Sequence, residues 1–213
     1  IAFSRQFPGL SEAAGLIGSD QIQNRSSLGG NLCNASPAAD SVPAMIVNGA
    51  RAIIATPDGT RTITVDQVAT APGHTSLEPG EFIVEFEVDK PPARTGDAYL
   101  RMTPRTEMDI AVVGAGARIT LDADGNCTEA RIALGAVAPT VRRVTDAEAA
   151  LIGHPITDDT LSAVAAAASA ACDPIDDKRG TIAYRKQVAG VLAKRVVKLA
   201  AERAAGTATE NGA

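Results

Sequence analysis

The sequence predicts an α+β protein, in which a unit of helices and hairpins precedes an antiparallel sheet packed by helices. Short alternating apolar runs separated by turn residues occupy the middle of the chain and indicate strands joined by hairpins. Longer segments with apolar residues at helical spacing follow them. With 213 residues and 45% hydrophobic side chains, the chain is long enough for two modest domains.

The charge balance is mildly acidic, with 20 Lys and Arg against 25 Asp and Glu and a net charge of −5. Because no stripe of clustered Lys or Arg is present in the sequence, no nucleic-acid partner is expected. No apolar run approaches the roughly 18 residues of a membrane span, and the first residues lack the order of a signal peptide. We therefore expect a cytoplasmic protein without a membrane span.

Cysteine usage and the chain start give two further expectations. Cys33, Cys127 and Cys172 are odd in number and far apart, without a C-x-x-C pair, so we expect reduced structural thiols and no metal site. The chain opens at Ile1, without an initiator Met, in a segment typical of the approach to a helix. We expect it to begin inside a longer gene product.

The first unit is expected to begin with a short helix over 8–17, followed by a polar, glycine-rich stretch over 19–40. Loops longer than about 12–15 residues are usually functional or disordered, which draws attention to this stretch. Asp40 or Ser41 is expected to cap the next helix, which runs through Val47.

Strands are expected next in this unit. Segments 50–56 and 61–65 flank Pro57-Asp58-Gly59 and predict a hairpin. Segment 81–88 alternates in polarity and predicts a half-buried strand. Its apolar positions are Phe82, Val84, Phe86 and Val88.

A Pro-Pro pair and a nearby glycine predict a linker, and we place the domain boundary there. The expected divisions are residues 1–94, 95–205 and a flexible tail over 206–213. The second unit's expected strands are 98–102, 110–121, 127–136 and 141–144, with a turn at 122–126 between the middle pair. Its expected helices begin at a capping box formed by Thr145 and Glu148, at Asp158, and at Thr181.

The segment 26–31 reads Ser-Ser-Leu-Gly-Gly-Asn and presents backbone amides that no side chain obstructs at its two glycines. Such a segment can approach a phosphate, a ribityl chain or a ring closely and donate several hydrogen bonds. A tight turn with ordinary polar satisfaction explains a glycine pair equally simply. From the residues alone, both interpretations stay open.

The longer run decides between them. Residues 21–40 read QIQNRSSLGGNLCNASPAAD, which closely resembles the signature of the FAD-binding medium subunit of the xanthine dehydrogenase and carbon monoxide dehydrogenase family. The resemblance continues through 105–111, 130–136 and 184–186 and so covers nearly the whole chain. It implies a PCMH-type FAD-binding subdomain followed by a domain like the C-terminal domain of the carbon monoxide dehydrogenase flavoprotein.

The resemblance also implies cofactors and partners. FAD is expected on this chain, with electrons arriving from a molybdopterin centre through two [2Fe–2S] clusters in partner subunits. Those partners are a large molybdopterin-binding subunit and a small iron–sulfur subunit, assembled as a dimer of heterotrimers. The positions that match the family's flavin contacts are Ile17, Ser27, Leu28, Gly29, Gly30, Asn31, Asp40, Ile83 and Arg101.

Each matched type has a physical use. Ser27, Asn31 and the glycine amides can hydrogen-bond FAD, and Asp40 can accept from a ribityl hydroxyl or a ring N–H. Ile17 and Ile83 can pack against the ring, and Arg101 places positive charge near reduced flavin. Gln23 and Ser27 stand where relatives usually carry Arg and Thr. The family's first glycine-rich FAD segment is expected upstream of Ile1, so FAD retention by the 213 residues alone stays open.

Other motifs have simpler explanations. Gly114-Ala115-Gly116 lacks the third glycine of a dinucleotide fingerprint and is typical of a buried strand. His74 and His154 stand alone in turns and are expected at the surface. The charged residues Arg105, Glu107 and Asp109 form either a functional cluster near the flavin or a solvated ion-pair network.

Two functions from different classes follow. The first is an oxidoreductase subunit that accepts electrons at FAD and passes them to an external acceptor, most like the medium subunit of aerobic carbon monoxide dehydrogenase. The alternative is a non-catalytic assembly subunit with a degenerate flavin site. The unbroken run from Ser27 to Asn31, with Asp40, favours the first. No acid, base or nucleophile for substrate chemistry stands out in the sequence.

Overall fold

The structure is a computed structural model and describes residues 2–106 and 108–207. The helices are α1 (Ala2–Gln6), α2 (Pro8–Gly15), α3 (Asp20–Gln23), α4 (Leu28–Cys33), α5 (Ser41–Val47), the 3-10 helix η1 (Val65–Gln67), α6 (Thr145–Ala149), α7 (Asp158–Ala170) and α8 (Ile182–Ala205). The strands are β1 (Arg51–Thr56), β2 (Gly59–Thr64), β3 (Ala69–Ala71), β4 (His74–Thr75), β5 (Phe82–Glu87), β6 (Thr95–Met102), β7 (Val113–Leu121), β8 (Cys127–Gly135) and β9 (Arg142–Arg143).

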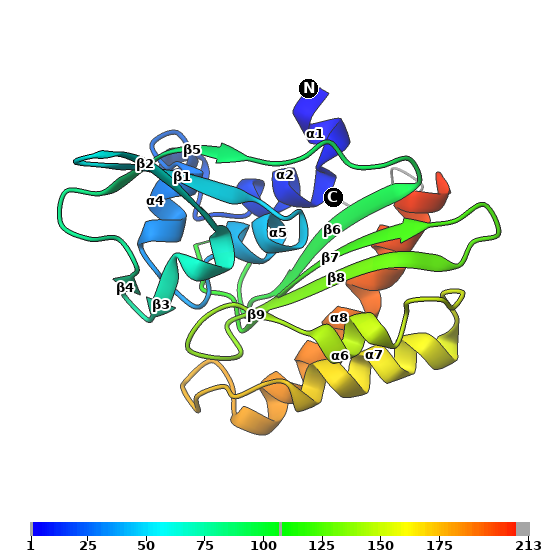
Figure 1. The fold of residues 1–213 in the computed structure, drawn as a ribbon. Helices are drawn as coiled ribbons and strands as arrows, with labels where there is room; N and C mark the ends of the chain where they lie inside the picture. The colour runs from blue at the N-terminus through cyan, green and yellow to red at the C-terminus, as the bar shows by residue number, and fades with distance from the viewer. Residues whose placement is uncertain (1, 107, 208–213) are drawn as a thin grey trace.

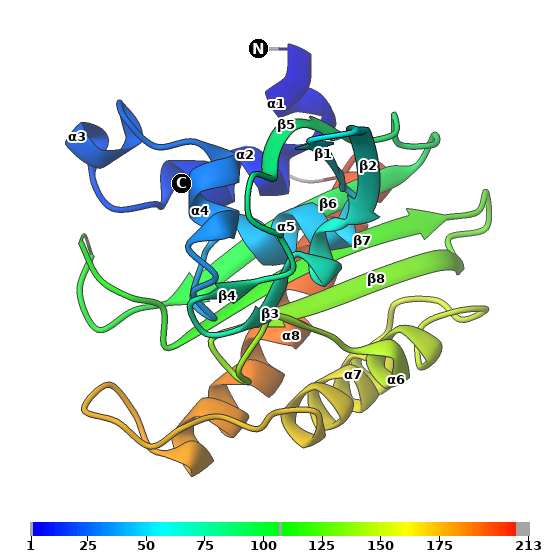
Figure 2. The same cartoon turned by 60° about the vertical axis from the view of Figure 1, so that its left-hand side comes forward.

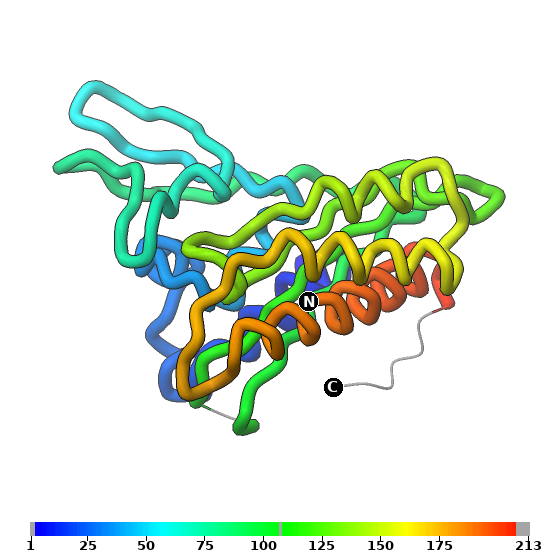
Figure 3. Tube along the Cα trace, turned by 90° about the horizontal axis from the view of Figure 1, so that it is seen from below, coloured from blue at the N-terminus to red at the C-terminus, as the bar shows by residue number. Residues whose placement is uncertain are grey.

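Among the described residues, β3 and β4 pair as a two-stranded sheet, and two larger antiparallel sheets organise the other strands. The smaller of these two has the order β2-β1-β5 and belongs to the first unit, while the larger has the order β6-β7-β8-β9. Figure 1 shows α6, α7 and α8 on one side of the larger sheet and α2 and α5 on its other side. Seen from below, α7 and α8 run side by side (Figure 3). The α+β class, with an antiparallel sheet packed by helices, is confirmed.

Each unit has its own core, and the larger sheet lies between them. The first core gathers residues of α2, α5, β1 and η1, and the second joins β6, β7 and β8 to the three C-terminal helices. Tyr99 of β6 and Ala133 of β8 belong to the first core, because alternate residues of a strand face opposite sides of the sheet. Strand β6 of the larger sheet therefore contributes the Tyr99 side chain directly to the core of the first unit.

Glycines bring helices close to both faces of the larger sheet. A Cβ on Gly96 would collide with the Ala200 carbonyl of α8, and one on Gly116 would lie 3.1 Å from the Pro43 carbonyl oxygen of α5. Residues 114–116 lie in β7 and are buried, so the buried-strand interpretation of this segment is confirmed. Gly116 permits close packing of α5, and Gly114 leaves room for the Tyr99 side chain.

The sequence-based alternation over 81–88 holds for Phe86 and Val88, which pack against the first core, but is wrong for Phe82 and Val84. Phe82 and Val84 are 61% and 52% exposed. The register between β1 and β5 shifts between Ile53 and Ile54, and at this irregularity Ile83 packs against the first core in place of Phe82 and Val84. A period-two pattern cannot reveal such a shift, because it is a property of the strand pair.

The expected capping box at α6 is also wrong, since the N-cap residue is Val144 and makes no side-chain cap. The Glu148 carboxylate instead accepts from the Ile132 amide at 3.0 Å and from Arg143 at 2.8 Å. A capping box does occur at α7, formed by Thr157 and Thr160. Glu148 therefore links α6 to β8 and to the residue that ends β9.

Candidate functional site

The glycine-rich segment folds as a short helix rather than a loop. Ser27 is the N-cap of α4, and its Oγ accepts from the Gly30 amide at 3.0 Å. The first amides of any helix have no acceptor within the helix, which leaves those of Leu28 and Gly29 available. A Cβ on Gly29 would have only Phe86 near it, at 3.9 Å, so the backbone here can be approached closely.

Behind α4, a buried hydrogen-bonded group connects the two units. The Asp40 carboxylate accepts from the Tyr99 hydroxyl and from Nη1 of Arg101, each at 2.7 Å. The Asp40 and Arg101 side chains are only 8% and 6% exposed. Asp40 makes no side-chain cap for α5, contrary to the expected capping role, because its carboxylate is turned toward β6. Arg101 makes no other hydrogen bond within the part of the chain that the structure describes.

Burial sets the ionisation of this group. It raises the pKa of Asp40 above its ordinary range, and the hydrogen bonds from Tyr99 and Arg101 only partly offset that effect. Burial and the neighbouring Asp40 carboxylate raise the pKa of Tyr99 well above that of a free phenol. Tyr99 therefore stays neutral at physiological pH and donates its proton to Asp40.

Two adjoining hollows lie in front of these elements. The α4 hollow measures about 300 Å³ and is lined in part by Ile17, Ser27 and Leu28. The Arg101 hollow measures about 360 Å³ and is lined by residues from the end of α2 to the end of α3, with Arg101 and Thr106. Both are lined by Gly15 and Gln23.

Gln23 forms the ridge between the two hollows. Its Nε2 donates to the Gly15 carbonyl at 2.8 Å and to the Ile17 carbonyl at 3.1 Å, which ties α3 to the end of α2. The departure from the family's Arg at this position therefore does not leave the segment loose. The neutral side-chain amide of Gln23 fixes the ridge through these two hydrogen bonds.

The remaining sequence-predicted residues lie nearby, in different roles. Gly29, Gly30 and Asn31 lie in α4, where the Asn31 Oδ1 accepts from the Ser41 hydroxyl at 2.7 Å. Ile83 lies in β5, packs against the first core and lines neither hollow. Its contact with flavin stays a prediction, as do those of the other matched positions.

The sequence-based list missed several contributors, among them Gly15, Thr106 and Tyr99. The signal for Tyr99 was available, because residues two apart in a strand share a face, and Tyr99 precedes Arg101 by two. Nothing in the sequence brings Gly15 or Thr106 to Arg101. Their meeting depends on the packing of the loop after α2 against the loop after β6.

The charged loop after β6 contains an ion-pair network. The Asp109 carboxylate accepts from the Ile110 amide at 2.8 Å and lies 3.5 Å from Nε of Arg105 and 3.8 Å from Nε of Arg179. Glu107 lies outside the described residues. The ion-pair interpretation of this segment describes what the structure contains, and a functional role for it stays a prediction.

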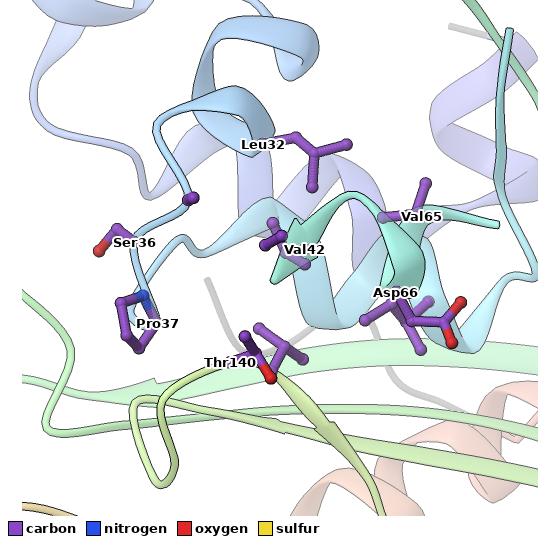
Figure 4. A pocket seen from close by; sticks show the side chains of 11 residues that line it. Leu32, Ser36, Pro37, Val42, Val65, Asp66 and Thr140 are labelled. Atoms are coloured by element: carbon purple, nitrogen blue, oxygen red, sulfur yellow. The ribbon is translucent and has the colours of Figure 1, made fainter. Parts of the chain in front are cut away.

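Other candidate sites are set aside on geometry. A cavity between Leu32, Val42, Val65 and Thr140 (Figure 4) measures about 10 Å³, which is space for one water molecule at most. Within residues 2–106 and 108–207, no cluster of three His, Cys, Asp or Glu side chains could hold a metal ion. No helix in those same residues is long and apolar enough to cross a membrane.

Two family models match the chain, one for each unit. Residues 1–91 match the FAD binding domain in molybdopterin dehydrogenase. Residues 98–200 match the CO dehydrogenase flavoprotein C-terminal domain. Their order along the chain is the order of the two cores.

Individual relatives agree with these models. The chain is 32% identical to the xanthine dehydrogenase FAD-binding subunit of Escherichia coli O157:H7, across 95% of this chain and 69% of that protein. It is 34% identical to the carbon monoxide dehydrogenase medium chain of Hydrogenophaga pseudoflava, across 94% and 69%.

Solved structures show the same architecture. The carbon monoxide dehydrogenase of Hydrogenophaga pseudoflava that lacks the Mo-pyranopterin moiety matches with a TM-score of 0.89 at 35% identity, across 94% of this chain and 69% of that one. The quinoline 2-oxidoreductase of Pseudomonas putida 86 matches with a TM-score of 0.87 at 28% identity, across 95% and 70%.

Fold and site together define an FAD-binding subunit of an oxidoreductase, with one flavin-binding unit and one sheet-and-helix unit. The chain belongs to the family of FAD-binding medium subunits of molybdopterin dehydrogenases, which serve multi-subunit molybdenum hydroxylases of the carbon monoxide and xanthine dehydrogenase type.

Proposed function

We propose that this chain binds FAD across the α4 hollow and the Arg101 hollow and carries electrons within a molybdenum hydroxylase of the carbon monoxide dehydrogenase type. One observation carries the proposal. Two adjoining hollows bring the family signature beside a nearly buried arginine, whose guanidinium has a single acceptor among the described residues. A buried cation with spare donors suits an anionic or strongly polar ligand.

The residues present fit FAD. The first amides of α4 and the Ser27 hydroxyl can donate to its polar groups, and the open Cβ positions of Gly15 and Gly29 permit close approach. Ile17 and Leu28 supply apolar contact from the same hollow. Bound FAD supplies a carrier of electron pairs.

Asp40 and Tyr99 act as positioning residues in this proposal. The Tyr99 hydroxyl donates to the Asp40 carboxylate, which in turn accepts from Nη1 of Arg101. The rest of the guanidinium is then left to face the hollow. The positive charge of Arg101 there favours a reduced flavin that carries negative charge, because opposite charges attract strongly where water is scarce. Asp40 therefore acts on the ligand through Arg101.

The proposal extends to partners. A large molybdopterin-binding subunit and a small subunit with [2Fe–2S] clusters would deliver the electrons, in a dimer of heterotrimers. The likeness to carbon monoxide dehydrogenase medium chains in sequence and in fold supports this type. The expected cytoplasmic location and the division near residue 94 remain predictions.

FAD content tests the proposal directly. The complex assembled with its partner subunits is denatured with acid, and the released FAD is measured by fluorescence against the amount of this chain. We expect about one FAD per chain, because one pair of hollows offers one continuous surface. A correctly assembled complex that contains no FAD and takes up none would contradict the proposal and favour an assembly role.

A variant ties FAD to the hollows. In Gly15→Leu the new side chain projects from the residue that both hollows share, where a Cβ meets nothing within 4 Å. We expect FAD affinity to fall at least about tenfold, or about 1.4 kcal/mol. Ala163→Leu adds comparable bulk at an exposed position of α7 and serves as the control. Equal affinity in both variants would place FAD elsewhere.

A further inference from the structure

The Asp40 carboxylate is held by two donors that differ in their access to a ligand. Tyr99 is buried and donates to Asp40, whereas Arg101 both donates to Asp40 and lines the Arg101 hollow. Asp40 directly precedes α5, and Figure 2 shows α5 against β6 and β7, with α4 beside it. A charge that arrives in the hollow therefore acts on Asp40 through one hydrogen bond of 2.7 Å.

The elements around this group present few ionisable side chains to it. Opposite Tyr99 and Arg101, β7 carries only glycines, Gly116 and Gly114. The next strand, β8, carries an alanine and a glycine at the matching positions. Helix α4 contributes the thiol of Cys33, whose pKa is raised by burial, so the thiol is neutral.

The other charged groups nearby are directed elsewhere. Glu12 of α2 accepts from the Tyr99 amide and from Arg203. Asp20 lines the same hollow, but it is exposed and forms no ion pair with Arg101 within the described residues. The charged side chains of η1, β8 and β9 likewise make no hydrogen bond or ion pair to Asp40 or Arg101 in that part of the chain, and they are Asp66, Glu129, Arg131, Arg142 and Arg143.

The local charge balance is therefore one negative charge on Asp40 against one positive charge on Arg101. A negative charge that develops on a ligand beside Arg101 leaves a net negative charge where little water screens it. A proton on Asp40 restores neutrality. A protonated carboxyl keeps an acceptor oxygen for Nη1 of Arg101 and gains a donor toward the Tyr99 oxygen.

We propose that Asp40 takes up one proton from solvent when the flavin held at Arg101 is reduced and becomes negatively charged. This rests on the proposed function, which places FAD in the Arg101 hollow. The flavin gains two electrons and one proton, Asp40 gains a second proton, and the electrons come from the iron–sulfur partner subunit. Burial already raises the pKa of Asp40, which brings the carboxylate closer to protonation before any charge arrives. Asp40 is thus a positioning residue whose own charge follows the redox state.

Infrared difference spectra test this uptake directly, without turnover. The assembled complex is reduced with dithionite at about pH 7, and the spectrum of the reduced complex is compared with that of the oxidised one. We expect a new carbonyl band from a protonated carboxyl group in the parent and no such band in Asp40→Asn. A parent complex with reduced FAD but without this band, or a band that persists in Asp40→Asn, would overturn the proposal.

Asp97→Asn is the matched control. Asp97 lies two residues before Tyr99 in β6 and so shares its face, and burial raises the pKa of Asp97 as well. Its carboxylate accepts from Asn48 at 2.8 Å and makes no contact with Arg101 among the described residues. The carbonyl band should persist in Asp97→Asn. Loss of the band in both variants would refute the assignment to Asp40.

Redox titration at several pH values gives a second readout. Between about pH 6 and pH 8 we expect two protons per two electrons in the parent and in Asp97→Asn, and one in Asp40→Asn. The hydrogen bond from Tyr99 lowers the pKa of Asp40, so in Tyr99→Phe the range of proton uptake should move to higher pH. A purely structural role would move neither quantity. If Asp40→Asn does not retain FAD, an unchanged range in Tyr99→Phe would overturn the proposal.

FAD content separates this proposal from the flavin assignment. Full FAD content with an unchanged proton count in Asp40→Asn would overturn only the proton uptake by Asp40. A correctly assembled parent complex that takes up no FAD would refute the proposed function and this proposal together.

Discussion

Arg185 and Arg101 are both nearly buried arginines, yet they are held very differently. Arg185, at the start of α8, donates to the carbonyls of Val112 and Ala136 and to the Asp177 carboxylate. Only its Nε lacks an acceptor among the described residues. Among the described residues, the Arg101 guanidinium donates to Asp40 alone, and Arg101 lines a hollow of about 360 Å³.

The difference separates an arginine that joins chain segments from one that is held ready for a ligand. Arg185 ties the residue before β7, the residue after β8 and the connection before α8 together, so both of its terminal nitrogens already have acceptors in the chain. Arg101 has one bond that fixes its direction, and most of its donor capacity faces the hollow. Burial alone does not distinguish the two, whereas the count of internal acceptors does.

The largest expected effect is on stability, from Arg185→Met. Removing one partner of a buried charged network costs about 3–5 kcal/mol, because Asp177 and two carbonyls lose their donor. Urea unfolding measures the loss. Lys186→Met, at the adjacent and less buried position, should cost under about 1 kcal/mol. If the fold is lost entirely, Asp177→Asn gives a milder test, and an unchanged free energy of unfolding there would refute the joining role.

Arg101→Met should act on the ligand instead. Hydrogen bonds to charged groups contribute about 1.5–3 kcal/mol, so FAD affinity of the assembled complex should fall about tenfold to a hundredfold. Arg101→Lys, which keeps the charge, should recover part of this loss. FAD retained at wild-type affinity in Arg101→Met would exclude this residue from the flavin site.

Tyr99→Phe should have a smaller effect on both properties. It removes one hydrogen bond to Asp40 and should lower stability by about 1 kcal/mol, with a modest loss of FAD affinity because Arg101 keeps its own bond to Asp40. A double-mutant cycle with Arg101→Met measures how strongly the two residues cooperate. Strict additivity would show that Tyr99 does not position Arg101.

The smallest effect is a difference in pH dependence between the two carboxylates. The hydrogen bond from Arg185 lowers the pKa of Asp177, so its contribution to stability is present above the unfolded-state pKa and is lost as pH falls through the folded-state pKa. Burial raises the pKa of Asp40, so its contribution is full below the unfolded-state pKa and decreases as pH rises through the folded-state pKa.

Urea unfolding between about pH 3 and pH 6 compares these slopes. The stability lost in Asp177→Asn should shrink as pH falls. The stability of Asp40→Asn relative to the parent should rise as pH rises. If the free energy of unfolding of both variants changed with pH in the same way, the pKa values of Asp177 and Asp40 would not be shifted in opposite directions.

The local sequence pattern predicted most of the fold, because strands and helices each require a characteristic spacing of apolar residues. The hairpin of β7 and β8 and the long helix α8 follow from alternation, turn residues and helical spacing. The failures lie where tertiary contact decides. Helical spacing groups Val191 with the apolar residues of α8, yet its side chain is 43% exposed, and the irregular pairing of β1 with β5 reverses the faces of Phe82 and Ile83.

The sequence-based list includes Ile17, Ser27, Leu28 and Arg101, which line the two hollows, but it could not give their arrangement. Its signature residues are close in sequence, and the run itself identified them. Two features required the fold, namely the formation of α4 from a stretch expected to be a loop, and the meeting of Asp40 with Tyr99 and Arg101 across about 60 residues. For side chains with several possible hydrogen-bond partners, such as Asp40 and Glu148, the packing of the folded chain determines which partner is within reach.

The ridge at Gln23 has a practical consequence for this surface. Its two bonds join a neutral amide to backbone carbonyls, so neither salt nor protonation weakens them appreciably in the way they weaken an exposed ion pair. The wall between the two hollows should therefore keep its shape during chromatography at high ionic strength. Any release of FAD under such conditions would report on the contacts of Arg101, not on a collapse of the surface around it.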